Sequence, residues 1–135
     1  IAISDASISV FKTKYTYNTL RPISFIRNVM GHTAWNSVIP TPAHPEYTPA
    51  HAVASAASAL VMDEIFGYNY SFTDHSYDAT WGPRTFSSFE AYANEAAHSR
   101  FLAGIHFMPS LEAGLIQGTK IGKMVNGLRF KTDKW

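Results

Sequence analysis

Glycine recurs at every fourth position near the end of the chain, at Gly114, Gly118 and Gly122. On a helix over residues 111–128, this spacing places the three glycines on one face, where a neighbouring helix can approach closely. The same spacing is typical of paired membrane helices, but charged side chains interrupt this segment and argue against a membrane. The pattern therefore constrains the chain to a tightly packed helical fold.

The segment that follows Thr48 predicts a second helix with a surface of small residues. Thr48 is expected to cap this helix, Pro49 suits its first position, and Gly67 is placed to end it after Phe66. Small side chains let neighbouring helices come close, so we expect a buried central helix. These side chains are Ala52, Ala54, Ala56, Ala57 and Ala59.

Apolar periodicity and helix start signals predict three further helices. They cover residues 2–14, 22–28 and 87–104. Residues 15–20 are expected to be irregular, because they are aromatic, β-branched or Asn apart from a final leucine. Lys14 would then lie at the end of the first helix.

Serines are expected to begin two of the helices. Ser87 and Glu90 fit a capping box, and Ser110 is placed to cap the last helix. Prolines in residues 32–47 and a Gly-Pro pair in residues 68–84 predict long ordered loops there. The predicted fold class is therefore all-α, a helical bundle with long ordered loops.

Charge and composition exclude several kinds of partner. Lys and Arg total 11 against 10 Asp and Glu, so no nucleic acid or anionic membrane is expected as the main partner. The chain has no cysteine, which excludes disulfides. The longest apolar run, residues 52–62, contains serines and is too short to span a bilayer, so no transmembrane segment is expected.

Five side chains from three fragments carry the chemistry that a tetrahedral oxyanion requires. Arginine supplies a fixed charge with paired planar donors, and the first N–H groups of a helix also favour an anion. One histidine can hold a proton for a leaving group, while a second can attack phosphorus or ligate a metal centre. The five side chains are Lys14, Arg21, His51, Arg100 and His106.

The spacing of these residues resembles three motifs of one superfamily. It is the superfamily of vanadium-dependent haloperoxidases and type-2 phosphatidic acid phosphatases, which also includes bacterial acid phosphatases. The motifs occur in the family's order and span most of the chain. They are Lys14 followed after six residues by Arg21-Pro22, Thr48-Pro49-Ala50-His51 in place of Pro-Ser-Gly-His, and Ser99-Arg100 followed after five residues by His106.

The resemblance implies a role for each matched residue. His106 would be the metal ligand of a haloperoxidase or the nucleophile of a phosphatase, and His51 would be the general acid–base. His44 falls where bromoperoxidases carry histidine and chloroperoxidases carry phenylalanine, so it would influence halide selectivity. The oxyanion, vanadate or phosphate, would be held by Lys14, Arg21, Ala50 and Arg100.

Three positions depart from the family motifs. Pro49 replaces a serine that would contact the anion, and Ala50 replaces a glycine but keeps its N–H. Ser110 replaces the aspartate that normally orients the ligand histidine, and losing such a partner costs about 10- to 100-fold in affinity or activity. Pro49→Ser together with Ser110→Asp is therefore expected to raise the affinity for the anion.

The resemblance leaves three functions open. The first is a vanadium-dependent haloperoxidase, which oxidises halide with hydrogen peroxide at a histidine-bound vanadate. The second is a phosphomonoesterase that acts on a phosphate monoester through a phosphohistidine and needs no cofactor. The third is a catalytically impaired anion-binding homologue. We favour the first, because the surroundings His44-Pro45-Glu46-Tyr47 are most similar to the soluble haloperoxidase-related branch.

The family domain is usually larger and has further helices before the lysine motif. Residues 1–135 are therefore expected to form a single domain that is the C-terminal, site-bearing part of a larger helical domain. An N-terminal segment or a second copy of the chain would then cover apolar surface on the first and last helices. The compartment stays open, and the resemblance allows a secreted or periplasmic location.

Overall fold

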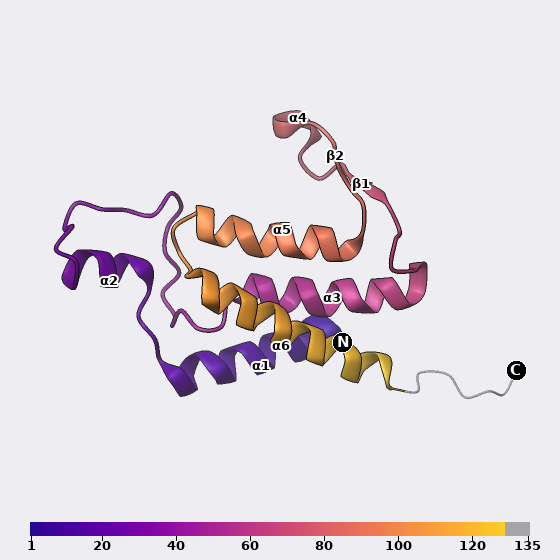
Figure 1. The fold of residues 1–135 in the computed structure, drawn as a ribbon, viewed down its shortest axis with the longest axis horizontal. Coiled ribbons are helices and arrows are strands. Elements are labelled where there is room, and N and C mark those ends of the chain that lie inside the picture. The colour runs from indigo at the N-terminus through magenta and orange to yellow at the C-terminus, as the bar shows by residue number, and fades with distance from the viewer. Residues whose placement is uncertain (129–135) are drawn as a thin grey trace, which may run out of the picture.

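The computed structural model describes residues 1–128, which form a helical bundle around one central helix (Figure 1). The central helix is α3 (Ala50–Phe66), and it packs against three others. These are α1 (Ala2–Tyr17), α5 (Phe89–Leu102) and α6 (Met108–Asn126). The all-α bundle predicted from the sequence is confirmed.

The glycines of α6 allow the closest helix contact in the bundle. A Cβ atom at Gly118 would overlap the backbone oxygen of Val53, and one at Gly114 would lie 2.9 Å from the Cβ atom of Ala52. The third glycine of the series approaches the next turn of α3 equally closely. The sequence predictions of a glycine packing face and of a buried central helix are both confirmed.

The inner face of α1 contributes to the core and continues to the buried Lys14. Ala6 and Val10 are buried and pack with Val53 of α3 and Ile121 of α6. Lys14 follows Val10 after one helical turn and is also buried, so the same packing that seals the core fixes the position of this cation. No helix within residues 1–128 is long and apolar enough to cross a membrane.

Two segments extend beyond this bundle (Figure 1). At the left of the view, α2 (Pro22–Asn28) is followed by the long irregular loop that the prolines predict. At the upper right, an antiparallel pair of β1 (Phe72–Asp74) and β2 (Arg84–Phe86) carries α4 (Asp78–Trp81) at its tip. The sequence predicted only a loop there, because strands of three residues are too short to show an alternating pattern.

Two helix ends differ from the sequence prediction because other partners were available. The first helix continues through Tyr17, since Asn18 adopts the left-handed conformation (φ 48°) and donates its N–H to the carbonyl of Lys14 at 2.8 Å. Residues 15–17 are therefore helical, not irregular. At the start of α3 the cap position is Pro49, because the hydroxyl of Thr48 donates to Gln117 instead, at 2.6 Å.

The two serine caps are also shifted. Ser88, not Ser87, caps α5 by accepting the N–H of Ala91 at 3.0 Å, so the predicted capping box does not form. The last helix begins at Met108, with Ser110 inside it instead of at its cap. The hydroxyl of Ser110 points to a buried side chain of the candidate site.

Candidate functional site

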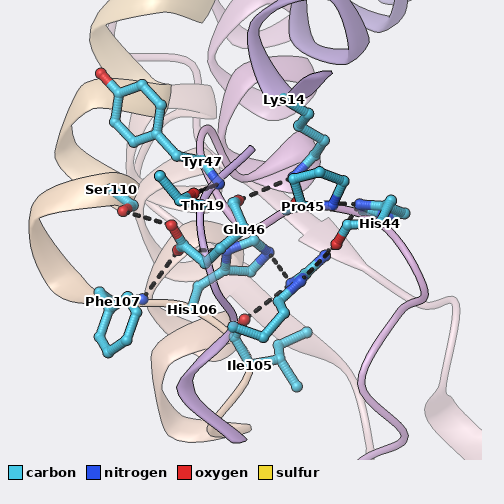
Figure 2. A network of polar contacts seen from close by, with 11 residues as sticks. Lys14, Thr19, His44, Pro45, Glu46, Tyr47, Ile105, His106, Phe107 and Ser110 are labelled. Carbon is cyan, nitrogen blue, oxygen red and sulfur yellow. Dashed lines mark hydrogen bonds and ion pairs between the residues drawn. The ribbon is translucent and has the colours of Figure 1, made fainter. Parts of the chain in front are cut away.

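Three segments that are distant in the sequence meet beside the loop that leads into α3 (Figure 2). The last turn of α1 supplies Lys14, the residue before α2 supplies Arg21, and the turn between α5 and α6 supplies His106. All three are buried, and Glu46 from the loop is buried among them. The structure thus brings together Lys14 and Arg21, from the first predicted motif, and His106, the histidine of the third motif.

Both ring nitrogens of His106 are engaged. Nδ1 lies 2.8 Å from Oε1 of Glu46, and Nε2 lies 3.0 Å from Nη1 of Arg21. A guanidinium can only donate, so Nε2 accepts and Nδ1 carries the proton. Burial lowers the pKa of His106 to about 4, although its hydrogen bond with Glu46 acts in the opposite direction. At neutral pH the ring is therefore neutral, with its lone pair on Nε2.

The carboxylate of Glu46 accepts three donors (Figure 2). They are Nδ1–H of His106 at 2.8 Å, the hydroxyl of Ser110 at 2.8 Å and the backbone N–H of Phe107 at 3.1 Å. Burial raises the pKa of Glu46, but the donors outweigh it and hold that pKa below its ordinary value. The contact with His106 is a hydrogen bond from a neutral imidazole to a charged carboxylate.

Glu46 was not predicted as a site residue, and the prediction for Ser110 was wrong. Ser110 was expected to mark the loss of the carboxylate that orients His106, but His106 has a carboxylate partner, Glu46, from the loop before α3. Ser110 supports that partner through its hydroxyl. The available signal was an acidic residue in a proline-rich loop, four residues before the helix that carries His51.

The guanidinium of Arg21 is held by four acceptors. Nε donates to the carbonyl of His44 at 2.9 Å, and Nη1 donates to the carbonyl of Ile105 at 2.8 Å as well as to His106. Nη2 lies 3.0 Å from Nδ1 of His44. Burial lowers the pKa of Arg21, and the charge of Glu46 partly offsets this. These contacts fix the plane of the guanidinium beside His106.

Lys14 is the most deeply buried cation of the site, with no exposed surface. Its ammonium donates to the carbonyls of Pro45 at 2.8 Å and Glu46 at 2.9 Å. Burial, and then the charge of Arg21, lower the pKa of Lys14 to about 8. Two acceptors leave one of its three N–H groups without a partner in the part of the chain that the structure describes.

His44 lies between the charged groups and an aromatic side chain. Its Nδ1 faces Arg21, and its ring meets that of Phe11 edge to face, with centroids 5.3 Å apart. Burial lowers the pKa of His44, and so do the nearby charges of Lys14 and Arg21. His44 is therefore neutral at neutral pH and borders the predicted anion site.

His51 and Arg100 form the second part of the predicted site. His51 is exposed in the first turn of α3, and its partial burial and the charge of Arg100 lower its pKa. The buried Nε of Arg100 has no hydrogen-bond partner among residues 1–128. Glu95, on the same helix as Arg100, pairs with Arg84 instead. Arg100 therefore keeps a donor available.

The start of α3 offers backbone donors but fewer than the family motif would. The first N–H that bonds back to the cap residue is that of Val53, which donates to the carbonyl of Pro49 at 3.1 Å. The N–H groups before it, including that of Ala50, have no helical acceptor. Pro49 contributes neither an N–H nor a hydroxyl.

The chemistry of this set is that of an oxyanion site. Within residues 1–128, no group of three or more His, Cys, Asp or Glu side chains is placed to hold a metal ion between them. The arrangement instead has one unprotonated imidazole nitrogen, Nε2 of His106, which accepts from Arg21 and has further cationic donors near it. Such a set suits a ligand that brings its own negatively charged oxygens.

Comparisons with known proteins identify the family and the fold. The model of a family described as the VCPO second helical-bundle domain matches residues 1–131. The solved structure of a bacterial vanadium-dependent iodoperoxidase is similar, with 41% identity, a TM-score of 0.85, and coverage of 95% of this chain and 32% of that one. A comparison with curated proteins found no match.

Two structures of bacterial vanadium-dependent chloroperoxidase share the fold at 18% identity. The holo type has a TM-score of 0.77 and coverage of 91% of this chain and 33% of that one. The apo type has a TM-score of 0.75, with 89% and 33%. The chain thus spans about a third of the length of the solved structures it matches. Because the family model covers nearly the whole chain, this protein belongs to the vanadium haloperoxidase superfamily, as a helical-bundle domain of the VCPO type.

Proposed function

We propose that this chain carries the vanadate site of a haloperoxidase, with Nε2 of His106 as the vanadium ligand. The observation that carries the proposal is the Glu46 hydrogen bond, which holds the proton on Nδ1 and leaves the lone pair on Nε2, 3.0 Å from Arg21. A neutral imidazole is the form that binds a metal centre. The unpartnered buried Nε of Arg100 also fits a site that receives an anion.

The remaining residues would hold the oxygens and move a proton. Lys14, Arg21 and Arg100 would neutralise the charge of the oxyanion, and the N–H of Ala50 would add a backbone donor. Bound vanadate supplies the Lewis acid that activates hydrogen peroxide. His51, exposed and with a lowered pKa, would exchange protons with the peroxide as general acid–base.

The halide and its contact are also part of the proposal. The similar structure at 41% identity is that of an iodoperoxidase, so iodide is the halide to test first. His44 would lie beside the bound oxyanion through its contact with Arg21. The neutral ring of His44 and the adjoining Phe11 would line the side of the site that the halide approaches.

Phosphatase chemistry is the second candidate, because the lone pair that binds vanadium can also attack phosphorus. The two differ in their requirements. A haloperoxidase needs added vanadate and is inhibited by phosphate, whereas a phosphatase needs neither peroxide nor vanadate and is inhibited by vanadate. An impaired homologue would show neither activity. This outcome is retained because Pro49 supplies neither an N–H nor a hydroxyl to the anion.

The first test is calorimetric titration of the protein with orthovanadate. We expect saturable binding that His106→Ala removes, because the ligand atom is lost. His75→Ala is the matched control, since His75 is exposed and pairs with Asp78 in the projecting hairpin. Equal vanadate affinity in the wild type and His106→Ala would reject the site. Oxidation of iodide by hydrogen peroxide, with and without vanadate, then separates haloperoxidase from phosphatase.

A further inference from the structure

The carboxylate that contacts His106 comes from an element that the family motifs do not include. Glu46 is 1% exposed and lies 60 residues before His106 in the sequence. Its two carboxylate oxygens are divided between partners (Figure 2). Oε1 accepts from Nδ1 of His106 and the N–H of Phe107, and Oε2 accepts from the hydroxyl of Ser110.

The backbone of Glu46 is anchored as firmly as its side chain. Its N–H donates to the carbonyl of Thr19 at 3.1 Å, and its carbonyl accepts the ammonium of Lys14 at 2.9 Å. The loop therefore cannot shift without disturbing the cation. One residue links the orientation of His106 to the position of Lys14.

We infer that Glu46 is the positioning residue of His106, and that Ser110 is its support instead of a defect. The side chains at positions 46 and 110 are complementary, since one supplies a carboxylate and the other the hydroxyl that donates to it. Together with Arg21, which donates to Nε2, they hold the proton on Nδ1 and leave Nε2 free of one. The carboxylate that contacts His106 thus comes from the loop before α3 and not from the helix after His106.

This pairing reverses the expectation for Ser110→Asp. An aspartate at position 110 cannot donate to Oε2 of Glu46, and it places a second negative charge against a buried carboxylate. Ser110→Asp alone should therefore weaken the site, not improve it. The same change should be favourable once Glu46 is removed, because the aspartate can then take over the contact with Nδ1.

The inference rests on the proposed function for its effect on vanadate, so the test uses two measurements. Nitrogen-15 NMR of the His106 ring reports which nitrogen carries the proton, and calorimetry reports vanadate affinity. In the wild type we expect the proton on Nδ1. We expect Glu46→Ala and Ser110→Asp each to weaken vanadate binding by about 10- to 100-fold. The double variant Glu46→Ala/Ser110→Asp should recover most of that loss.

Two further variants control for structural damage. Glu46→Gln keeps an oxygen that can accept from Nδ1–H, so it should keep the proton on Nδ1 and lose less affinity than Glu46→Ala. Asp63→Asn removes a buried carboxylate at the far end of α3 and should change neither measurement.

The outcomes separate the two proposals. A proton on Nε2 in the wild type, or a double variant no better than Ser110→Asp, would overturn the positioning role. A protein that binds no vanadate, but whose ring proton stays on Nδ1 in the wild type and moves in Glu46→Ala, would retain the positioning role and reject the proposed function. If Glu46→Ala binds vanadate as tightly as the wild type, the positioning role is overturned and the proposed function is retained.

Discussion

Two buried carboxylates lie near the opposite ends of α3 and differ in their hydrogen bonding. Glu46, in the loop before the helix, is 1% exposed, and Asp63, in its last turn, is 5% exposed. Three donors meet the carboxylate of Glu46, whereas the buried Oδ1 of Asp63 has no hydrogen-bond partner within residues 1–128. Two groups of the same chemistry and similar burial therefore stand in very different environments.

The donors decide whether the pKa of each buried carboxyl is lowered or raised. Burial raises the pKa of both carboxyls, but the donors to Glu46 bring its pKa below the ordinary value. The pKa of Asp63 stays raised, by burial and then by the charge of Glu90. Asp63 borders an open cleft of about 460 Å³ between α3, α5 and α6, whereas Glu46 is enclosed by the site. The comparison teaches that an organised set of donors can keep a buried carboxylate charged where burial alone would favour its protonation.

The largest expected effect comes from removing each carboxylate in turn. Glu46→Leu should lower the free energy of unfolding by about 3 to 5 kcal/mol, because it leaves buried Lys14 and Arg21 without their nearby negative charge. Asp63→Leu should leave stability unchanged or raise it, because no donor among residues 1–128 loses its acceptor. Urea unfolding of both variants measures the difference. Equal losses in the free energy of unfolding would show that the donors to Glu46 do not set the two carboxylates apart.

A smaller effect is expected in the pH dependence of stability. The lowered pKa of Glu46 gives stability that is present above its unfolded pKa and is lost as the pH falls through the lower, folded pKa. The raised pKa of Asp63 gives stability that is present below its unfolded pKa of 3.8 and is lost as the pH rises through the higher, folded pKa.

Asp63→Asn should therefore become more stable than the wild type as the pH rises above 3.8, and match it in more acid solution. The gain at neutral pH should be about 1 kcal/mol, the scale of one unsatisfied buried polar group. Thermal unfolding at several pH values measures it. A difference that does not vary with pH would show that the charge of Asp63 is not the cause.

The smallest effect concerns the neighbour of Asp63. Glu90→Gln removes the charge that adds to the burial of Asp63, so the pKa of Asp63 should fall toward its ordinary value. The gain in stability should be only a few tenths of a kcal/mol, because Glu90 is exposed. Carbon-13 NMR titration of the Asp63 carboxyl provides the measurement. Glu112→Gln, an exposed charge of the same type on α6, is the control.

Much of the fold was predictable because its signals are local. The repeat of Gly114, Gly118 and Gly122 predicted close packing, and the structure seats these residues on α3. The helix boundaries were less predictable. Ser87, Thr48 and Ser110 were each a reasonable cap, but a hydroxyl donates to whichever acceptor the fold brings near, and for Thr48 that acceptor is on α6.

Several residues of the candidate site were predictable, but the hydrogen bonds among them were not. Family resemblance selected Lys14, Arg21 and His106 from their spacing, and these three lie together in the structure. The resemblance included Glu46 only among the surroundings of the motifs and gave it no role in the site. It also misjudged Ser110, because its hydroxyl gains a role only when Glu46 is beside it.

The sequence by itself determined the helical class, the close approach of two helices and the cations and histidines available to the site. Those properties depend on residue type and on spacing within single segments. The tertiary structure alone decided which carboxylate orients His106 and which is left without a donor. Glu46 and His106 are 60 positions apart, and only the packing of α1, α3 and α6 brings them within hydrogen-bond distance.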